Sequence, residues 1–147
     1  INEINRSILL NRVALALQPP GHPKRQYSLN NLAASLQQRY RKSELAGDLE
    51  ECILLDSEAL TLRPQGHPDR HYSCYNLANS LHHRFLKGGL VRYLNEAIAL
   101  GREAIPLRPR GIRYFEAVDN QRIYLYDRFK IKGAVEDLQE AITLAEE

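Results

Sequence analysis

The amino-acid sequence predicts an all-α protein built from successive helix pairs. Three observations support this: the chain repeats itself about every forty-five residues, its apolar residues recur with the period of a helix, and its glycines and prolines stand between the helical segments. The alternation of apolar and polar residues that marks a β-strand is missing. Helix pairs that recur at a fixed period predict a solenoid, in which each pair buries its apolar face against the next.

The internal repeat covers the whole chain. A shift of forty-five residues aligns apolar positions with one another, for example Leu32 with Leu77, Leu36 with Leu81, Leu49 with Leu94 and Ile53 with Ile98. A third copy follows with one residue deleted, and the first seventeen residues match the second half of a repeat. We therefore expect a single array over 1–147, a fragment of a longer protein. Its parts are the second helix of a truncated repeat (1–17) and repeats 18–62, 63–107 and 108–147.

Each repeat contains two segments with the period of a helix. In the first segment of repeat one, a single helical stripe is formed by Leu29, Leu32, Ala33, Leu36 and Tyr40. The second segment repeats this spacing, from Leu49 onward. The predicted helices are 3–17, 24–42, 46–62, 69–87, 91–106, 113–131 and 134–146.

Glycine and proline mark the ends of these segments. Gly-His-Pro-Lys-Arg (21–25) and Gly-His-Pro-Asp-Arg (66–70) precede two of the predicted first helices. Glycine suits a turn, and proline suits the first helical turn, whose N–H groups have no helical partner. Because His22 and His67 recur with the turn, we expect them to have a local structural role rather than a ligand role. The glycines are expected only at turns, which inside the repeats means Gly47, Gly88-Gly89 and Gly133; Pro106 is expected to shorten its helix.

Composition argues against several classes of protein. The 147 residues are 44% hydrophobic and carry a net charge of +2, from 20 basic and 18 acidic residues. Basic and acidic residues are interleaved, so we expect no nucleic-acid partner. No apolar run approaches the roughly 18 residues of a membrane span, so we expect no membrane partner. Cys52 and Cys74 are isolated, which favours a reducing compartment and a cytoplasmic location.

The residue pattern of the helix pairs resembles the tetratricopeptide repeat. Its first-helix signature is matched by Asn31-Leu32-Ala33-x-x-Leu36 and Asn76-Leu77-Ala78-x-x-Leu81, and its second-helix signature by Glu96-Ala97-Ile98, Ala104-Ile105 and Pro109. The period is longer than the family's thirty-four residues, and the forty-five-residue form is similar to repeats of kinesin light chains and of fungal multidomain proteins with CHAT peptidase or nucleotide-binding domains. The resemblance implies a right-handed α-solenoid of antiparallel helix pairs, whose first helices line a concave groove that binds proteins.

The positions beside the core stripe of each first helix would line that groove. They are Tyr27, Asn30, Ala34, Gln37 and Gln38 in repeat one, Tyr72, Tyr75, Asn79, His82 and His83 in repeat two, and Glu116, Asp119, Ile123, Tyr126 and Asp127 in repeat three. Tyrosine, asparagine and histidine predict an extended segment held by stacking and backbone hydrogen bonds. The acidic residues of repeat three favour a basic residue in the partner. Two of these tyrosines, Tyr27 and Tyr72, have a second interpretation, which is packing against a neighbouring helix.

Other polar residues have simpler interpretations. The recurring Arg39, Arg84 and Arg128 stand at the ends of first helices, where a cation favours the helix dipole, and this interpretation is preferred to a phosphate site. In repeat three, Gln121 and Arg122 replace the Leu-Ala pair of the other repeats, which places close packing there in doubt.

Neither catalysis nor metal binding is predicted. His71 and the adjacent His82 and His83 lack a cysteine or carboxylate at ligand spacing, and no base is arranged for Ser73 or Ser80. We therefore expect a non-enzymatic protein without cofactors.

Two functions remain from different classes. The first is a recognition module that binds a peptide segment or an adjoining domain in its groove. The second is a structural spacer or self-association scaffold, suggested by the apolar Leu138, Ile142 and Leu144 of an uncapped last helix.

Overall fold

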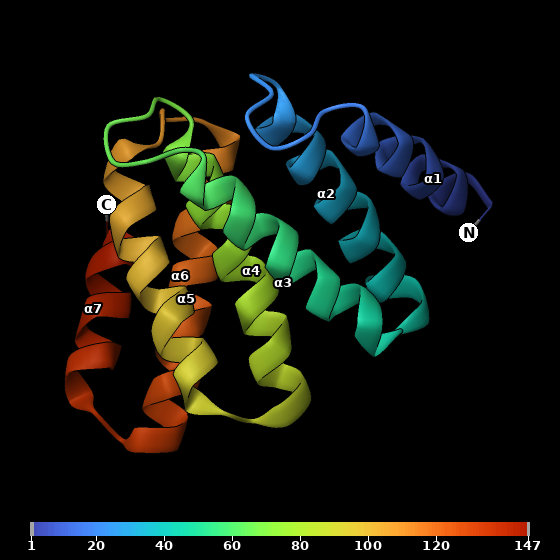
Figure 1. The fold of residues 1–147 in the computed structure, drawn as a ribbon. Coiled ribbons are helices and arrows are strands. Elements are labelled where there is room, and N and C mark those ends of the chain that lie inside the picture. The colour runs from blue at the N-terminus through green and yellow to red at the C-terminus, as the bar shows by residue number, and fades with distance from the viewer. Residues whose placement is uncertain (1, 147) are drawn as a thin grey trace. The chain divides into compact units, whose positions relative to one another are not determined.

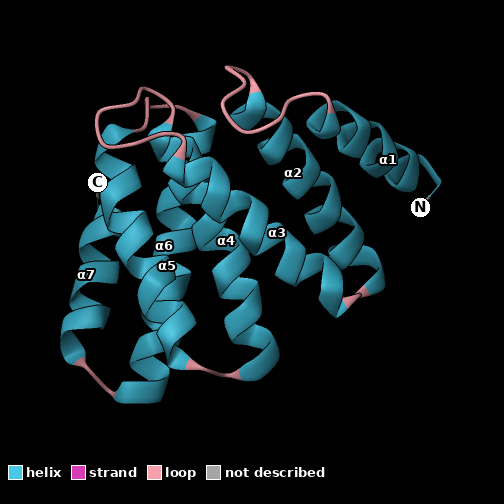
Figure 2. Ribbon diagram, in the orientation of Figure 1, coloured by secondary structure: helices cyan, strands magenta, loops and turns pink. Residues whose placement is uncertain are grey.

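The computed structural model describes residues 2–146, which form seven α-helices and one short 3-10 helix (Figure 1). In chain order these are α1 (Asn2–Ala16), α2 (Arg25–Ser43), α3 (Ala46–Thr61), α4 (Arg70–Gly88), α5 (Val91–Ala104), η1 (Ile105–Leu107), α6 (Ile112–Lys132) and α7 (Val135–Glu146). Short loops join them, and the described residues contain no strand (Figure 2). The predicted all-α class is confirmed, and each predicted helix end lies within about two residues of the observed one.

The chain divides into two compact units, one up to Ser73 and the other from Cys74 onward. The first contains α1, α2, α3 and the first turn of α4, and α2 packs against both α1 and α3. The second contains the rest of α4 together with α5, η1, α6 and α7, and α6 packs against both α5 and α7.

Each unit has its own apolar core, and in the first unit this core includes the stripe that the repeat predicts. In the first unit, Ile4 and Ile8 of α1 pack with Leu32 and Leu36 of α2 and with Cys52 of α3. In the second unit, the core cluster consists of Ile105, Tyr114, Ala117 and Val118, with Tyr75 and Leu144 packed against it. Cys52 is fully buried and stands where the other repeats have Ala97 and Ala141, so it acts as a small apolar core residue.

The pentapeptides 21–25 and 66–70 form the same local structure. The His22 Nδ1 atom accepts a hydrogen bond of 3.1 Å from the backbone N–H of Lys24, and His67 Nδ1 accepts one of 3.0 Å from Asp69. The arginine that ends the first pentapeptide, Arg25, donates to the backbone carbonyl of residue 18, and Arg70 donates to that of residue 63. These contacts support the local structural role predicted for both histidines, since each ring orders the turn before its helix.

The glycine prediction is partly wrong. Gly89 and Gly133 have φ angles of 74° and 69° and lie in the turns inside repeats two and three. The matching residue of repeat one is Glu44, with φ 53°, and Gly47 lies inside α3. Gly101 also lies inside a helix, α5, so turns do not account for all glycines. The prediction for Pro106 is confirmed, because α5 ends at Ala104 and a 3-10 turn follows.

Replacing Glu44 with glycine should stabilise the first unit. A residue with a Cβ atom is strained in the left-handed region, and the Glu44 side chain is exposed. We expect the free energy of unfolding to rise by about 0.5–1 kcal/mol, measured by urea denaturation. Gly133→Ala is the reciprocal control and should lower it by a similar amount; stabilities that do not differ between these variants and wild type would contradict the strain argument.

Candidate functional site

Three of the predicted groove residues line one pocket in the first unit. Tyr27 and Asn30 come from α2, and Tyr72 comes from the first turn of α4. The pocket has a volume of about 300 Å³, and its remaining lining residues are Asn31, Arg63, Asp69 and His71. The other residues predicted in this repeat, Ala34, Gln37 and Gln38, lie farther along α2 and do not line the pocket.

Two residues of the pocket wall have buried polar atoms without a hydrogen-bond partner among the described residues. The Asn30 side chain is only 7% exposed, and neither atom of its amide group has a hydrogen-bond partner among the described residues. Arg63 is 2% exposed; it donates to Ser73 Oγ at 3.0 Å and lies over the Tyr27 ring, while its Nε–H has no partner. Each such group typically costs about 1–3 kcal/mol when buried without a hydrogen bond.

Several predicted groove residues of the second unit have polar partners within that unit. His82 Nε2 lies 2.8 Å from Asp127 Oδ2, so the structure joins two residues that the sequence predicts for the same surface. Asp127 also forms an ion pair of 3.4 Å with Lys130, and Asp119 forms one of 3.2 Å with Arg122. These cations offset the acidic character that was expected to favour a basic partner.

The remaining predicted residues lie at different depths. Tyr75 is partly buried, and its hydroxyl accepts a hydrogen bond of 3.3 Å from Asn120. Asn79 and His83 are partly buried, while Glu116 is exposed. Asp119, Arg122, Ile123 and Tyr126 line a shallow hollow on α6 with a volume of about 550 Å³. Burial raises the pKa of the nearby Tyr124, and Tyr75 adds to this rise.

Two arginines lie beside predicted groove residues but are absent from the sequence prediction. Arg63 lines the pocket of the first unit, and Arg108 of the second unit lies over the Tyr75 ring, 4.5 Å from its centre. The signal that could have found them is the recurring Leu-Arg-Pro at 62–64 and 107–109. The proline of this motif suits a helix end, and the sequence alone predicts no role for the arginine before it.

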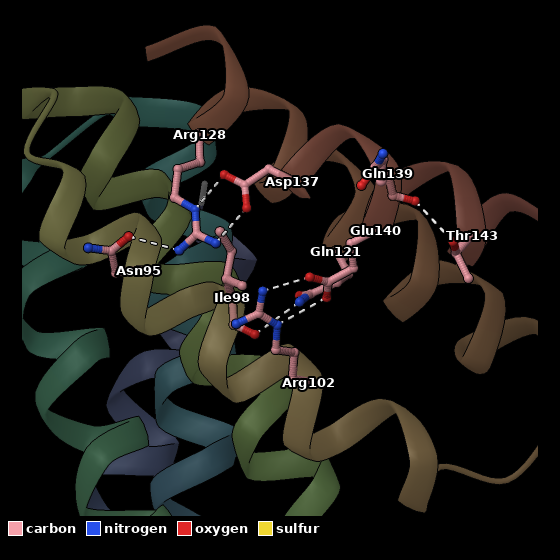
Figure 3. Close-up of polar contacts among 9 residues, drawn as sticks. All are labelled: Asn95, Ile98, Arg102, Gln121, Arg128, Asp137, Gln139, Glu140 and Thr143. Atoms are coloured by element: carbon pink, nitrogen blue, oxygen red, sulfur yellow. Dashed lines mark hydrogen bonds and ion pairs between the residues drawn. The ribbon is translucent and has the colours of Figure 1, made fainter. Parts of the chain in front are cut away.

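The arginines at the ends of first helices bind to the following helix. Arg39 donates to both carboxylate oxygens of Asp48, each at 2.7 Å, and Arg128 donates to both of Asp137, at 2.8 and 2.7 Å (Figure 3). The matching Arg84 lies over the ring of Tyr93, which replaces aspartate in repeat two. These side chains therefore tie the two helices of a repeat together, a more specific role than the expected interaction with the helix dipole.

The Arg128 pair changes the titration of its carboxylate. Hydrogen bonding to Arg128 lowers the pKa of Asp137, and burial opposes this shift. A second partner, Asn95 of α5, accepts a hydrogen bond of 3.0 Å from the same guanidinium (Figure 3). Arg128 therefore joins α5, α6 and α7.

Gln121 fits into the core because the facing residue of α5, Gly101, has no side chain. It is 1% exposed, and its Nε2 donates to the backbone carbonyl of Ile98 at 2.9 Å (Figure 3). A Cβ atom on Gly101 would lie 1.8 Å from Gln121 Oε1. Glycine on the facing helix therefore makes room for the amide at the position where the sequence placed close packing in doubt.

Within residues 2–146, no helix combines the length and the apolar character that a membrane span requires. Within the same range, no three His, Cys, Asp or Glu side chains gather in a way that could hold a metal ion. His82, considered above as a ligand, is instead paired with Asp127.

Comparisons with known proteins add no relative to this description. No family model, no curated protein and no solved structure matches the chain.

Proposed function

We propose that this chain is a non-enzymatic recognition module of tetratricopeptide type. In this proposal it is a right-handed solenoid of antiparallel helix pairs, and its first helices hold a segment of a partner protein or of an adjoining domain. The support is the forty-five-residue repeat together with the pocket lined by Tyr27, Asn30, Arg63 and Tyr72.

The unsatisfied amide of Asn30 is the observation that carries the proposal. A peptide group offers one N–H donor and one C=O acceptor, and a primary amide can satisfy both. Arg63 Nε–H is a second donor for a carbonyl or carboxylate oxygen of the bound segment. Tyr27 and Tyr72 supply aromatic surface beside these groups, as aromatic residues do in many interfaces.

Replacing Asn30 with leucine should separate binding from stability. The substitution keeps a similar volume and removes two buried polar atoms that lack partners. We therefore expect the free energy of unfolding to rise by about 1 kcal/mol, while the affinity for the partner segment falls by about tenfold or more.

The partner segment for this test comes from selection on a displayed library of random linear peptides. An enriched peptide is then synthesised and titrated by calorimetry against wild type, Asn30→Leu and the control Lys42→Leu, whose side chain is exposed on the same helix outside the predicted groove. Lys42→Leu should leave affinity and stability unchanged. Unchanged affinity in Asn30→Leu, or a selection that enriches no peptide, would contradict binding at this pocket.

The structural scaffold is the alternative function. Val135 and Ile142 of α7 are exposed, which supports association through this helix, whereas Leu144 packs against the core of its unit. Light scattering over a concentration series distinguishes the two functions. Concentration-dependent association that Ile142→Gln abolishes would favour the scaffold.

A further inference from the structure

Helix α1 carries an apolar surface that no described residue covers. Leu10 and Val13 of α1 are 59% and 51% exposed, and Leu17, directly after the helix, is 74% exposed. Glu3, in the first turn of α1, lies on the same helical face as these residues. The Glu3 side chain is exposed. We call these four residues the α1 face.

The matching residues of α3 indicate what kind of element the α1 face contacts. A shift of forty-five residues places Glu3 on Asp48, Leu10 on Leu55 and Val13 on Glu58 of α3. All three residues of α3 face α2. Asp48 binds Arg39, Glu58 binds Arg25 with Oε2 2.6 Å from its Nε, and Leu55 packs against the cluster that contains Leu32 and Leu36.

The second unit uses the same positions in the same way. Glu103 of α5, which matches Glu58, accepts from Cys74 of α4 at 3.3 Å. Asp137 of α7, which matches Asp48, binds Arg128 of α6. In three second helices, therefore, this face receives a first helix, and in α1 the corresponding face is open.

We infer that the α1 face binds an amphipathic helix with the pattern of this chain's own first helices. That pattern, taken from Leu29, Leu32, Ala33, Leu36 and Arg39, places apolar residues at i, i+3, i+4 and i+7 and an arginine at i+10. The apolar residues cover Leu10 and Val13, and the arginine pairs with Glu3 as Arg39 pairs with Asp48. This surface is separate from the pocket of Asn30 and does not depend on it.

The probe is a fluorescein-labelled synthetic peptide that copies residues 24–44, titrated with the protein by fluorescence anisotropy. Saturable binding is expected, and the double variant Leu10→Gln, Val13→Gln should weaken it by about tenfold or more, because two apolar side chains lose their burial. Both residues are more than half exposed, so circular dichroism melting should show the variant folded. Leu54→Gln is the matched control, since Leu54 is 71% exposed on α3 and should not affect binding.

A charge exchange tests the register of the contact. Glu3→Arg should weaken binding of the wild-type peptide, and a peptide carrying Arg39→Glu should bind Glu3→Arg better than it binds wild type. Absence of peptide binding, or an affinity that neither the double variant nor the charge exchange changes, would overturn the inference. The second outcome would mean that the peptide displaces α2 or binds elsewhere.

Two further controls separate this surface from other uses of the chain. Asn30→Leu should bind the peptide as wild type does, so failure of the proposed function would leave this result intact. Sedimentation should show no dimer that depends on Leu10 and Val13. A dimer through these residues that the peptide cannot dissociate would overturn the inference, because the occupant would then be a second copy.

Discussion

Replacing Gly101 with alanine should lower the free energy of unfolding by about 2 kcal/mol. In an open helix interior the same change would stabilise by up to about 1 kcal/mol, because alanine is the better helix former. At Gly101 the new Cβ would lie 1.8 Å from Oε1 and 2.5 Å from Cδ of Gln121. Gln121 is fully buried, so relief of this contact disturbs the core and breaks the hydrogen bond to Ile98.

The control and the rescue for this prediction are both present in the chain. Gly47 lies inside α3, and a Cβ there would meet nothing within 4 Å, so Gly47→Ala should stabilise by about 0.5 kcal/mol. A double-mutant cycle with Gln121→Ala should show a favourable coupling of about 1–2 kcal/mol, because the shorter side chain frees the space. Urea unfolding measures all four variants, and a Gly101→Ala protein as stable as wild type would contradict the fit between these helices.

Replacing Asp137 with asparagine should lower the free energy of unfolding at pH 7 by about 2 kcal/mol. The substitution removes the charge that Arg128 contacts with two hydrogen bonds and leaves the guanidinium partly buried without a carboxylate. It also removes a negative charge from the first turn of α7, where such a charge is favourable.

The pH dependence of this effect has a definite sign. The pKa of Asp137 is lowered in the folded protein, so its stabilisation is fully present above the unfolded-state pKa of about 3.9 and is lost as pH falls through the folded-state value. The stability curves of wild type and Asp137→Asn should therefore converge at low pH. Glu136→Gln, at an exposed position in the same helical turn, is the control: it removes a charge from that turn but no hydrogen bond to Arg128, so it should cost much less stability at pH 7 than Asp137→Asn. Curves of wild type and Asp137→Asn that stay parallel from neutral to acidic pH would contradict the assignment.

Sequence reasoning was most successful where one local rule decides the outcome. The helix ends follow from apolar spacing and from proline, which explains why Pro106 ends α5 two residues earlier than α3 ends. The prediction of the turn residue failed in repeat one, because the residue in the left-handed conformation there is Glu44 and not a glycine, and no composition rule marks it. Arg39 and Asp48 are nine residues apart in the chain, and Arg128 and Asp137 have the same spacing. This recurrence could have revealed the pairing.

The candidate site was only partly predictable for a different reason. The helical period places Tyr27 and Asn30 on one side of α2, because position on a helix face depends on residue number alone, whereas only the folded chain brings Tyr72 of α4 to the same pocket. The period cannot say which of these side chains will find partners. Tertiary contacts satisfy His82 with Asp127 and leave Asn30 without a hydrogen bond.

By itself, the sequence determined that this protein is all-α, where its helices begin and end, and which faces of them are apolar. These properties depend on short-range spacing and on the backbone preferences of proline and glycine. Only the tertiary structure decided that Gly101 makes room for Gln121, that Arg63 is buried in a pocket with Asn30, and that the α1 face remains open. Those outcomes depend on which side chains from different helices meet, and neither period nor composition contains that information.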